Sequence, residues 1–156
     1  MLWCWNKGAY LQFHPATDLY LPLVFTRWEG MELMGYQPLL YAIDSQDIAV
    51  TGQGIIDGGG SNQHWWPWKG KWKHTPWQVD AKAEQKDGRA LLMTMVEQAA
   101  PVTDRVLPQN FLRPPLWQPY RCQRVEISGV TLRNSPFWVL NPVLCQDVVV
   151  RSVNIT

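Results

Sequence analysis

The sequence predicts an all-β fold, a parallel β-helix in which each turn of the chain stacks on the turn before it. The first observation is a repeat, because the segment 122–132 returns without a gap as 145–155, 23 residues later. The second is that apolar and polar residues alternate inside each copy, which is the period of a β-strand. Short strands that recur at a fixed period indicate a stacked repeat in which one copy forms one layer.

The copies predict about three layers. An earlier copy covers 45–52 and, after an offset of one residue, 55–58, so that Ser45 stands where the later copies have Cys122 and Cys145. The apolar positions are expected to face the interior; in the middle copy they are Val125, Ile127, Val130 and Leu132, and in the last copy Val148, Val150, Val153 and Ile155. The rival interpretation is a leucine-rich repeat. It requires recurring Leu and a helical return segment, and neither is present.

Two long segments interrupt the repeat, at about 14–36 and 58–115. The second contains a predicted helix over about 81–99, which Gly88 weakens and Pro101 closes. The apolar face of this helix comprises Leu91, Leu92, Met95 and Val96. We expect one incomplete β-helix domain over residues 1–156. Its insertions are expected to wall a groove, since ordering them costs about 1–2 kcal/mol per residue in backbone entropy.

The composition excludes several classes of function. A formal net charge of +1, with scattered Lys and Arg, leaves no basic surface for nucleic acid or an anionic membrane. No apolar stretch reaches the roughly 18 residues of a membrane span, and the N-terminal residues lack a secretion signal. His14, His64 and His74 do not have metal-ligand spacing, so neither a metal site nor a cofactor is expected.

Cysteine and tryptophan each leave alternatives open. Cys122 and Cys145 occupy equivalent positions in neighbouring copies, which favours stacked free thiols over a disulfide, a redox role or a catalytic role. Ten tryptophans are the compositional outlier, and five of them lie close together: Trp65, Trp66, Trp68, Trp72 and Trp77. Such a cluster either fills the core of a loop or presents flat rings to a partner such as a sugar, and the core interpretation is favoured.

Ordered motifs along the chain resemble one known family. They are the segment 47–58, Trp65-Trp66, Leu112-Arg113-Pro114, the segment 129–138 and Asn141-Pro142. Together they resemble the polygalacturonase-like pectinases, glycoside hydrolase family 28, from about Tyr10 to Thr156. The most specific part is Arg-Asn-Ser-Pro-Phe-Trp at 133–138, followed one layer later by Asn-Ile-Thr at 154–156. The segment 26–30 looks like the bacterial branch that has long N-terminal loops.

The resemblance implies a right-handed parallel β-helix that hydrolyses galacturonic-acid-containing pectin with inversion at the anomeric carbon. Inversion needs two carboxyl groups about 6.5–9.5 Å apart. In the family these belong to an Asn-x-Asp motif after the Asn-Ile-Thr layer and to an Asp-Asp pair, with Gly-His-Gly and Arg-x-Lys motifs beyond. None of these motifs is present here, so we expect no catalytic residue in this chain, no activity of the chain alone, and catalytic Asp residues beyond Thr156.

Three residues are candidates for substrate binding. Trp138 could stack against a sugar ring or be buried between layers, and Asn141 stands where similar enzymes often carry His. Arg27 could pair with a substrate carboxylate or simply with Glu29 at the surface. A turn role is expected for the acids of the layers, which include Asp57, Asp47 and Asp147.

The expected partners are a pectic polysaccharide or oligogalacturonide and the missing C-terminal layers of the same domain, with no nucleic acid and no membrane. The alternative function is a non-catalytic carbohydrate-binding or structural β-helix segment. A pectate lyase would require clustered calcium-binding acids, and Val148–Ile155 offers none. Relatives are commonly exported, so the localisation stays open, and the long N-terminal loops favour trimming from chain ends.

Overall fold

The computed structural model describes residues 2–71, 74–80, 83–107 and 111–156, which divide into two compact units. The first, the β-helix unit, comprises Met1–His14, Pro38–Gly59 and Pro115–Thr156. The second, the insertion unit, comprises Pro15–Gln37 and Gly60–Pro114. The segments that interrupt the repeat therefore pack into a compact unit of their own.

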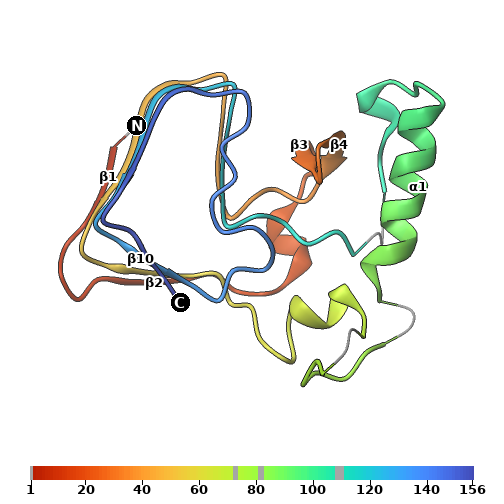
Figure 1. Ribbon diagram of the computed structural model, residues 1–156, viewed down its shortest axis with the longest axis horizontal. Helices are drawn as coiled ribbons and strands as arrows, with labels where there is room; N and C mark the ends of the chain where they lie inside the picture. Colours follow the sequence, from red (N-terminus) through yellow and green to blue (C-terminus); the bar gives the residue numbers. More distant parts are fainter. Residues whose placement is uncertain (1, 72–73, 81–82, 108–110) are drawn as a thin grey trace. The chain divides into compact units, whose positions relative to one another are not determined.

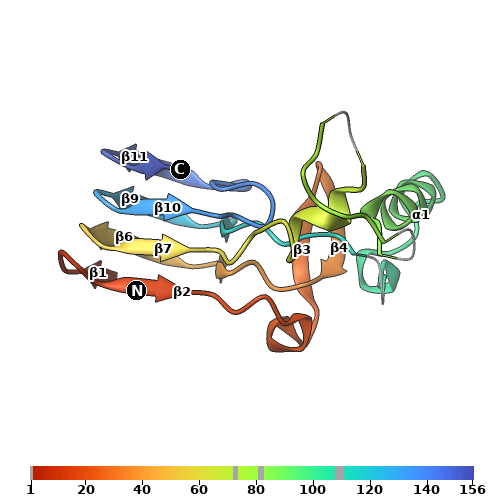
Figure 2. The ribbon, with the colours of Figure 1, turned by 90° about the horizontal axis from the view of Figure 1, so that it is seen from below.

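Parallel strands stacked in layers form the β-helix unit, and Figure 2 shows the layers one above another. One four-stranded sheet has, in order, β1 (Leu2–Trp5), β6 (Gln46–Gly52), β9 (Gln123–Ser128) and β11 (Gln146–Arg151). A second has β2 (Tyr10–Gln12), β7 (Ile55–Asp57), β10 (Thr131–Arg133) and β12 (Asn154–Ile155). All of these pairings are parallel, which confirms the predicted β-helix.

A third stack completes each turn. Strand β5 (Leu40–Ile43) pairs in parallel with β8 (Trp117–Tyr120). Single bridges from Leu140 to Trp117 and from Val143 to Tyr120 continue it into the next layer. Successive turns consequently overlie one another in the view of Figure 1, with the corners of the chain in register.

The strand register confirms the repeat. Gln46 pairs with Gln123, and Gln123 pairs with Gln146, so the three copies lie in adjacent layers. The backbone N–H of Cys122 points to Cys145 Sγ at 3.4 Å, as expected for residues stacked one layer apart. The offset of one residue is also observed, because Thr131 pairs with Ile55.

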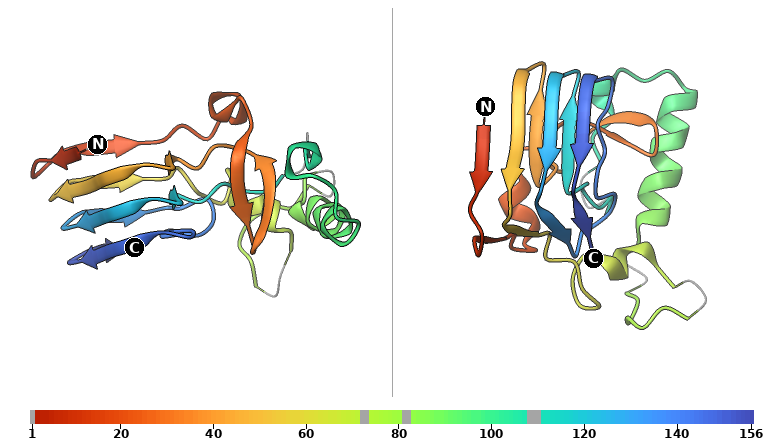
Figure 3. Two further views of the ribbon diagram at one scale, coloured as in Figure 1. Left: turned by 90° about the horizontal axis from the view of Figure 1, so that it is seen from above. Right: turned by 60° about the vertical axis from the view of Figure 1, so that its left-hand side comes forward.

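The structure contains one layer more than the repeat indicates. Strands β1 and β2 form a further layer of the stack, beside β6 and β7 (Figure 3). In the strand register Trp3 lies opposite Val50, and Leu11 lies opposite Ile56. This layer carries Trp and Leu in place of the β-branched residues of the other copies, and the first insertion separates it from them. Its sequence therefore did not match the repeat.

Corners of the β-helix recur at equivalent positions with left-handed backbone angles. Asp47, Arg124 and Asp147 have φ values of 55°, 53° and 53°. At the next corner the chain needs glycine, because a Cβ built on Gly129 would lie 2.2 Å from the carbonyl oxygen of Gly52. The turn role predicted for Asp47 and Asp147 agrees with these corner conformations.

The core lies inside the stack. The inward residues of the middle copy are almost fully buried, as predicted: Val125, Ile127, Val130 and Leu132. Ser45, Cys122 and Cys145 form a column in which each side chain donates a hydrogen bond to the carbonyl two residues earlier, at 2.7, 3.3 and 3.4 Å. A hydroxyl and a thiol can both make this local bond, so either Ser or Cys can occupy this position of a layer. All three cysteines are free.

The insertion unit contains a hairpin where the sequence predicts a loop. Strands β3 (Val24–Trp28) and β4 (Met31–Gly35) pair antiparallel, with Arg27 opposite Glu32. Glu29 and Gly30 form the two-residue turn with φ values of 44° and 85°. Positive φ at both positions is what a tight hairpin turn requires, and Glu-Gly is a weaker signal for it than Asn-Gly.

Among the described residues of this unit one α-helix is present, as predicted, and it is shorter than the predicted range of about 81–99. Helix α1 runs over Gln85–Glu97, and the expected start near 81–82 lies outside the described residues. Leu92 is fully buried, whereas Leu91 is about half exposed, so the predicted apolar face is only partly correct. Among the described residues no helix is long and apolar enough to cross a membrane.

Short 3-10 helices complete the insertion unit: η1 (Thr17–Tyr20), η2 (Trp66–Lys69) and η3 (Val102–Asp104). Arg105, just after η3, ties the hairpin to the end of α1. Its Nη1 donates to the carbonyl of Glu32 at 3.1 Å, and its Nε donates to the carbonyl of Ala100 at 2.9 Å.

Candidate functional site

The three predicted binding residues are divided between the units. Trp138 and Asn141 lie in the β-helix unit, within the connection from β10 to β11. Arg27 lies in the insertion unit, on strand β3. The candidate site can therefore be built only around Trp138 and Asn141, and the role of Arg27 stays a prediction.

Trp138 is held by its backbone and presents its ring at the surface. Its carbonyl accepts hydrogen bonds from the N–H of Leu116 at 2.9 Å and from Ser135 Oγ at 3.3 Å. The indole stacks on Phe137 with a centroid distance of 5.0 Å and an angle of 12°, and the residue is 43% exposed. A fixed, partly exposed indole is suited to contact the apolar face of a sugar ring.

Asn141 lies in the same connection between β10 and β11. Its backbone N–H donates to the carbonyl of Trp117 at 2.9 Å, which places it on the layer above β8. Its Nδ2 is buried and has no hydrogen-bond partner among the described residues. An unsatisfied buried donor costs about 1–3 kcal/mol.

Arg27 pairs within its own hairpin. Its guanidinium lies 3.7 Å from the carboxylate of Glu32, the residue opposite it in the strand register. Glu29, the partner considered from the sequence, instead receives a hydrogen bond of 2.7 Å from Arg89 of α1. The surface pairing of Arg27 with Glu29 was therefore wrong, because the hairpin turn carries Glu29 away from the ladder.

Asp57 anchors the segment that carries Trp138. Its buried carboxylate accepts hydrogen bonds from Tyr10, Arg133 and Asn134 at 2.5, 2.8 and 3.0 Å, and from the N–H of Gly59 at 2.9 Å. These donors come from three layers, so a single carboxylate joins β2, β7 and the residues after β10. Burial alone would raise the pKa of Asp57, but the hydrogen bonds from Tyr10, Gly59, Arg133 and Asn134 hold it below its usual value.

The residue after Asp57 packs closely against the same segment. A Cβ built on Gly58 would lie 2.7 Å from the carbonyl oxygen of Asn134 and 2.9 Å from Pro136 Cδ. The N–H of Gly58 also donates to the carbonyl of Arg133 at 2.9 Å. The sequence could have revealed this arrangement, because the repeat aligns Asp57 with Arg133, opposite charges in adjacent layers.

Other acids of the β-helix unit are paired with arginine in the next layer. The pairs are Asp44 with Arg121 at 2.6 Å, Asp47 with Arg124 at 2.7 Å, and Glu126 with Arg151 at 2.7 Å. Hydrogen bonds from the arginines hold the pKa of Asp44 and Asp47 below its usual value, and bonds from Ser128 and Arg151 do the same for Glu126. A general acid at neutral pH needs a raised pKa, so these carboxylates do not suit that role.

The described part of the chain was compared with the arrangements of side chains that bind metal ions. Within it, no group of three or more His, Cys, Asp or Glu side chains is arranged to hold a metal ion.

The tryptophan cluster lies in the insertion unit, where one of its described rings is buried. Trp65 is 2% exposed and lies edge-on to Tyr20 and Trp68, with centroid distances of 5.6 and 4.9 Å. Trp66 and Trp77 contact each other at 6.4 Å. Trp72 lies outside the described residues. The core interpretation of the cluster is thus observed for Trp65, while the rings of Trp66, Trp68 and Trp77 remain partly exposed.

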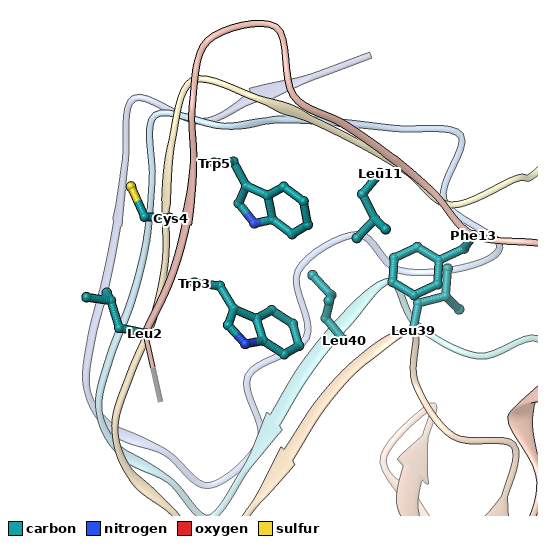
Figure 4. A pocket seen from close by; sticks show the side chains of 8 residues that line it. All are labelled: Leu2, Trp3, Cys4, Trp5, Leu11, Phe13, Leu39 and Leu40. Carbon is teal, nitrogen blue, oxygen red and sulfur yellow. The ribbon is translucent and has the colours of Figure 1, made fainter.

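An apolar pocket of about 550 Å³ lies inside the layer formed by β1 and β2 (Figure 4). Figure 4 shows the rings of Trp3, Trp5 and Phe13 and the side chains of Leu11 and Leu40 directed toward the interior of the turn, whereas Leu2 and Cys4 point away. Trp3 and Leu11 continue columns that contain Val50 and Ile56. The pocket is therefore an extension of the hydrophobic core and lacks the polar groups that a sugar site requires.

Comparison with solved structures gives two informative similarities. An exopolygalacturonase from Thermotoga maritima, described as hyperthermoactive, is 40% identical with a TM-score of 0.89; the match covers 98% of this chain and 34% of that one. A protein of Parabacteroides merdae named as a candidate glycosyl hydrolase is 18% identical with a TM-score of 0.54, over 99% of this chain and 50% of that one, and shows the fold alone. The present chain thus spans about a third of the length of the first and half of the second.

No family model matches the chain, and no curated protein sequence matches it.

Proposed function

The chain belongs to the polygalacturonase-like family, glycoside hydrolase family 28, of which it carries a segment, and we propose that it is the substrate-binding portion of a pectin-hydrolysing glycosidase. The supporting observation is the 40% identity to an exopolygalacturonase over 98% of this chain. That enzyme acts from chain ends, which agrees with the preference for end trimming drawn from the long N-terminal loops.

In this proposal the chain binds a galacturonic-acid-containing polysaccharide through Trp138 and Asn141. The indole of Trp138 stacks on a sugar ring, and the side chain of Asn141 makes a polar contact with the substrate. Asp57 holds the connecting segment in place through Asn134. Arg27, in the insertion unit, stays a separate candidate for pairing with a substrate carboxylate.

Hydrolysis itself is assigned to carboxylates in layers beyond Thr156. Stacked layers lie about 4.8 Å apart, so residues separated by two layers are about 9.6 Å apart, near the upper end of the spacing of about 6.5–9.5 Å that an inverting mechanism needs. One carboxylic acid would protonate the leaving oxygen while a carboxylate activates water on the opposite face. The paired acids Asp44, Asp47, Asp57 and Glu126 do not take part in these steps.

Binding by the chain itself is the direct test. Titration with trigalacturonate, followed by isothermal calorimetry, is expected to show binding that Trp138→Ala weakens about tenfold and Trp138→Phe largely preserves, because stacking requires only a flat ring. Leu144→Ala, an exposed change in the same connection, is the matched control. Equal affinity in wild type and Trp138→Ala would contradict the proposed site.

Activity is tested in two steps. The 156-residue chain is expected to release no reducing ends from polygalacturonate, and release would contradict the assignment of the acids. A chimaera in which this chain replaces the aligned third of the Thermotoga exopolygalacturonase is expected to cleave polygalacturonate. A folded chimaera without cleavage would contradict the proposal that this chain supplies the binding layers of such an enzyme.

The second candidate function is a carbohydrate-binding or structural β-helix without catalysis. The observation that favours it is the pairing of Asp44, Asp47 and Glu126 with arginine, which leaves these acids unsuited to proton transfer. It predicts trigalacturonate binding by the chain together with an inactive chimaera.

A further inference from the structure

Arg133 is a positively charged residue at the start of the segment that carries Trp138. It ends strand β10 and lies on the outer side of its sheet, because Leu132 before it is fully buried in the core and side chains alternate along a strand. The Arg133 side chain is 39% exposed. A guanidinium group therefore reaches solvent in the same unit and the same segment as the indole of Trp138.

Two neighbouring layers hold this guanidinium in one orientation. Its Nε donates to Asp57 Oδ2 at 2.8 Å, and its Nη2 donates to the hydroxyl of Tyr10. Its Cζ lies 5.0 Å from the centre of the Tyr10 ring, which adds a cation–π contact. Its Nη1 donates to no described residue, so the group is preorganised and keeps a donor for a ligand.

The acid paired with Arg133 is buried, unlike the acids of the other ion pairs between layers. In those pairs the arginine donates to the acid through both Nε and Nη2, and between 31 and 71% of the acid's side chain is exposed. They are Arg121 with Asp44, Arg124 with Asp47, and Arg151 with Glu126. Asp57 is only 3% exposed. An anion that approaches Arg133 therefore meets the cation of the pair, whereas at the other pairs it meets both charges.

Arg133 also lies next to the last layer of the chain. The backbone N–H of Thr156 donates to the carbonyl of Leu132 at 3.0 Å, so Thr156 and Arg133 stand in adjacent layers. The proposed function assigns the hydrolytic carboxylates to layers beyond Thr156. A substrate group bound at Arg133 would consequently belong to a sugar close to those layers.

The chemistry of the group identifies what it binds. A guanidinium is planar and always charged, and its N–H donors match the geometry of a carboxylate. We infer that Arg133, held in place by Asp57 and Tyr10, binds the carboxylate of a galacturonate unit and makes the site select charged over methyl-esterified pectin. This inference rests on the proposed function and adds to it the residue that recognises the acid group.

A matched pair of ligands tests the inference. Trigalacturonate and its fully methyl-esterified form have the same sugar rings, but the ester carries no negative charge. Isothermal calorimetry with the full chain is expected to show trigalacturonate binding about tenfold more tightly than the ester, and Arg133→Gln is expected to abolish this preference. Arg133→Lys keeps the charge but not the planar donors, and should reduce the preference about threefold.

Arg124→Gln is the matched control, because it removes the same charge from an exposed ion pair of the same unit. It is expected to leave the preference for trigalacturonate unchanged. An equal loss of preference in Arg124→Gln and Arg133→Gln would show a general effect of net charge and would overturn the inference.

The ester separates a contact with the ligand from a purely structural role. If Arg133 only supports the Trp138 segment through Asp57, Arg133→Gln weakens the binding of both ligands by the same factor, which overturns the inference. Circular dichroism shows whether this variant is folded. If it is not, Arg133→Lys decides, and an unchanged preference in that variant overturns the inference.

Failure of the proposed function gives a different result. A preference that depends on Arg133, with binding that does not depend on Trp138, supports the carboxylate contact and contradicts the stacking contact. Binding that depends on Trp138, with a preference that Arg133→Gln leaves intact, supports the proposed function and overturns this inference. No binding of trigalacturonate by the folded wild-type chain overturns both.

Discussion

The β-helix unit and the insertion unit are ordered by different means. In the first, each layer repeats the hydrogen bonds and corner angles of its neighbour, as with Gln46, Gln123 and Gln146. In the second, one aromatic cluster around Trp65, an antiparallel hairpin and a single helix pack once, without repetition. Repetition leaves a signal in the sequence because each layer must accept the same neighbours, whereas a unique packing arrangement leaves none.

The largest expected effect tests how strictly the layers constrain each other. Gly129→Ala is expected to lower the free energy of unfolding by more than about 4 kcal/mol, since its Cβ would lie 2.2 Å from the Gly52 carbonyl. Gly30→Ala in the hairpin turn, where no atom lies within 4 Å of the new Cβ, is expected to lose only the cost of left-handed backbone, about 1–2 kcal/mol. Urea denaturation followed by circular dichroism measures both, and equal losses would contradict the steric argument.

A cavity made in the aromatic cluster tests whether the two units unfold independently. Trp65→Ala is expected to destabilise the insertion unit by about 3–5 kcal/mol, because a fully buried ring is removed. Hydrogen exchange is expected to speed up at the amides of β3 and α1 while β9 keeps its protection. Equal loss of protection in β9 would show that the two units unfold as one.

The buried carboxylate of Asp57 makes the β-helix unit sensitive to acid. Its pKa is lower in the folded chain than the unfolded value near 4, so its contribution is full above about pH 4 and is lost as the pH falls through the folded pKa. Asp57→Asn is expected to cost about 1–3 kcal/mol at pH 7 and to flatten the loss of stability below pH 4. Thermal melts from pH 2 to pH 7 measure this, and parallel profiles for the two proteins would refute it.

The smallest effect is expected at the exposed ion pairs between layers. Arg124→Gln removes the pair with Asp47, whose side chain is 71% exposed, and should leave the denaturation midpoint unchanged within error. A marked drop that disappears in 0.5 M salt would instead show that exposed pairs help to align the layers.

The sequence predicted the β-helix unit far better than the insertion unit. Cys122 and Cys145 gave the layer period directly, and the alternation around Ile127 gave the inward face. Strands β1 and β2 were not predicted because Trp3 and Leu11 occupy positions where the next layer has the β-branched residues Val50 and Ile56. Their sequence therefore does not match the repeat. The hairpin of the insertion unit was not predicted because Glu29 and Gly30 are a weak turn signal.

The candidate sites show the same limit. Trp138 was recognised from its motif, and its partly exposed, stacked ring agrees with a binding role that awaits measurement. The hydrogen bonds of Asp57 that hold this segment come from three stacked layers and could not be listed from the sequence. The alignment of Asp57 with Arg133 in the repeat did indicate an ion pair between adjacent layers.

By itself the sequence determined the period, the inward face and the family of this chain, because each follows from residues that recur or stand in a fixed order. The tertiary structure alone decided which acids form ion pairs with arginine, which indoles remain exposed and how the insertions pack together. Those properties depend on burial and on contacts between residues up to 123 positions apart, such as the hydrogen bond from Arg133 to Tyr10. Local sequence patterns carry no record of such distant contacts.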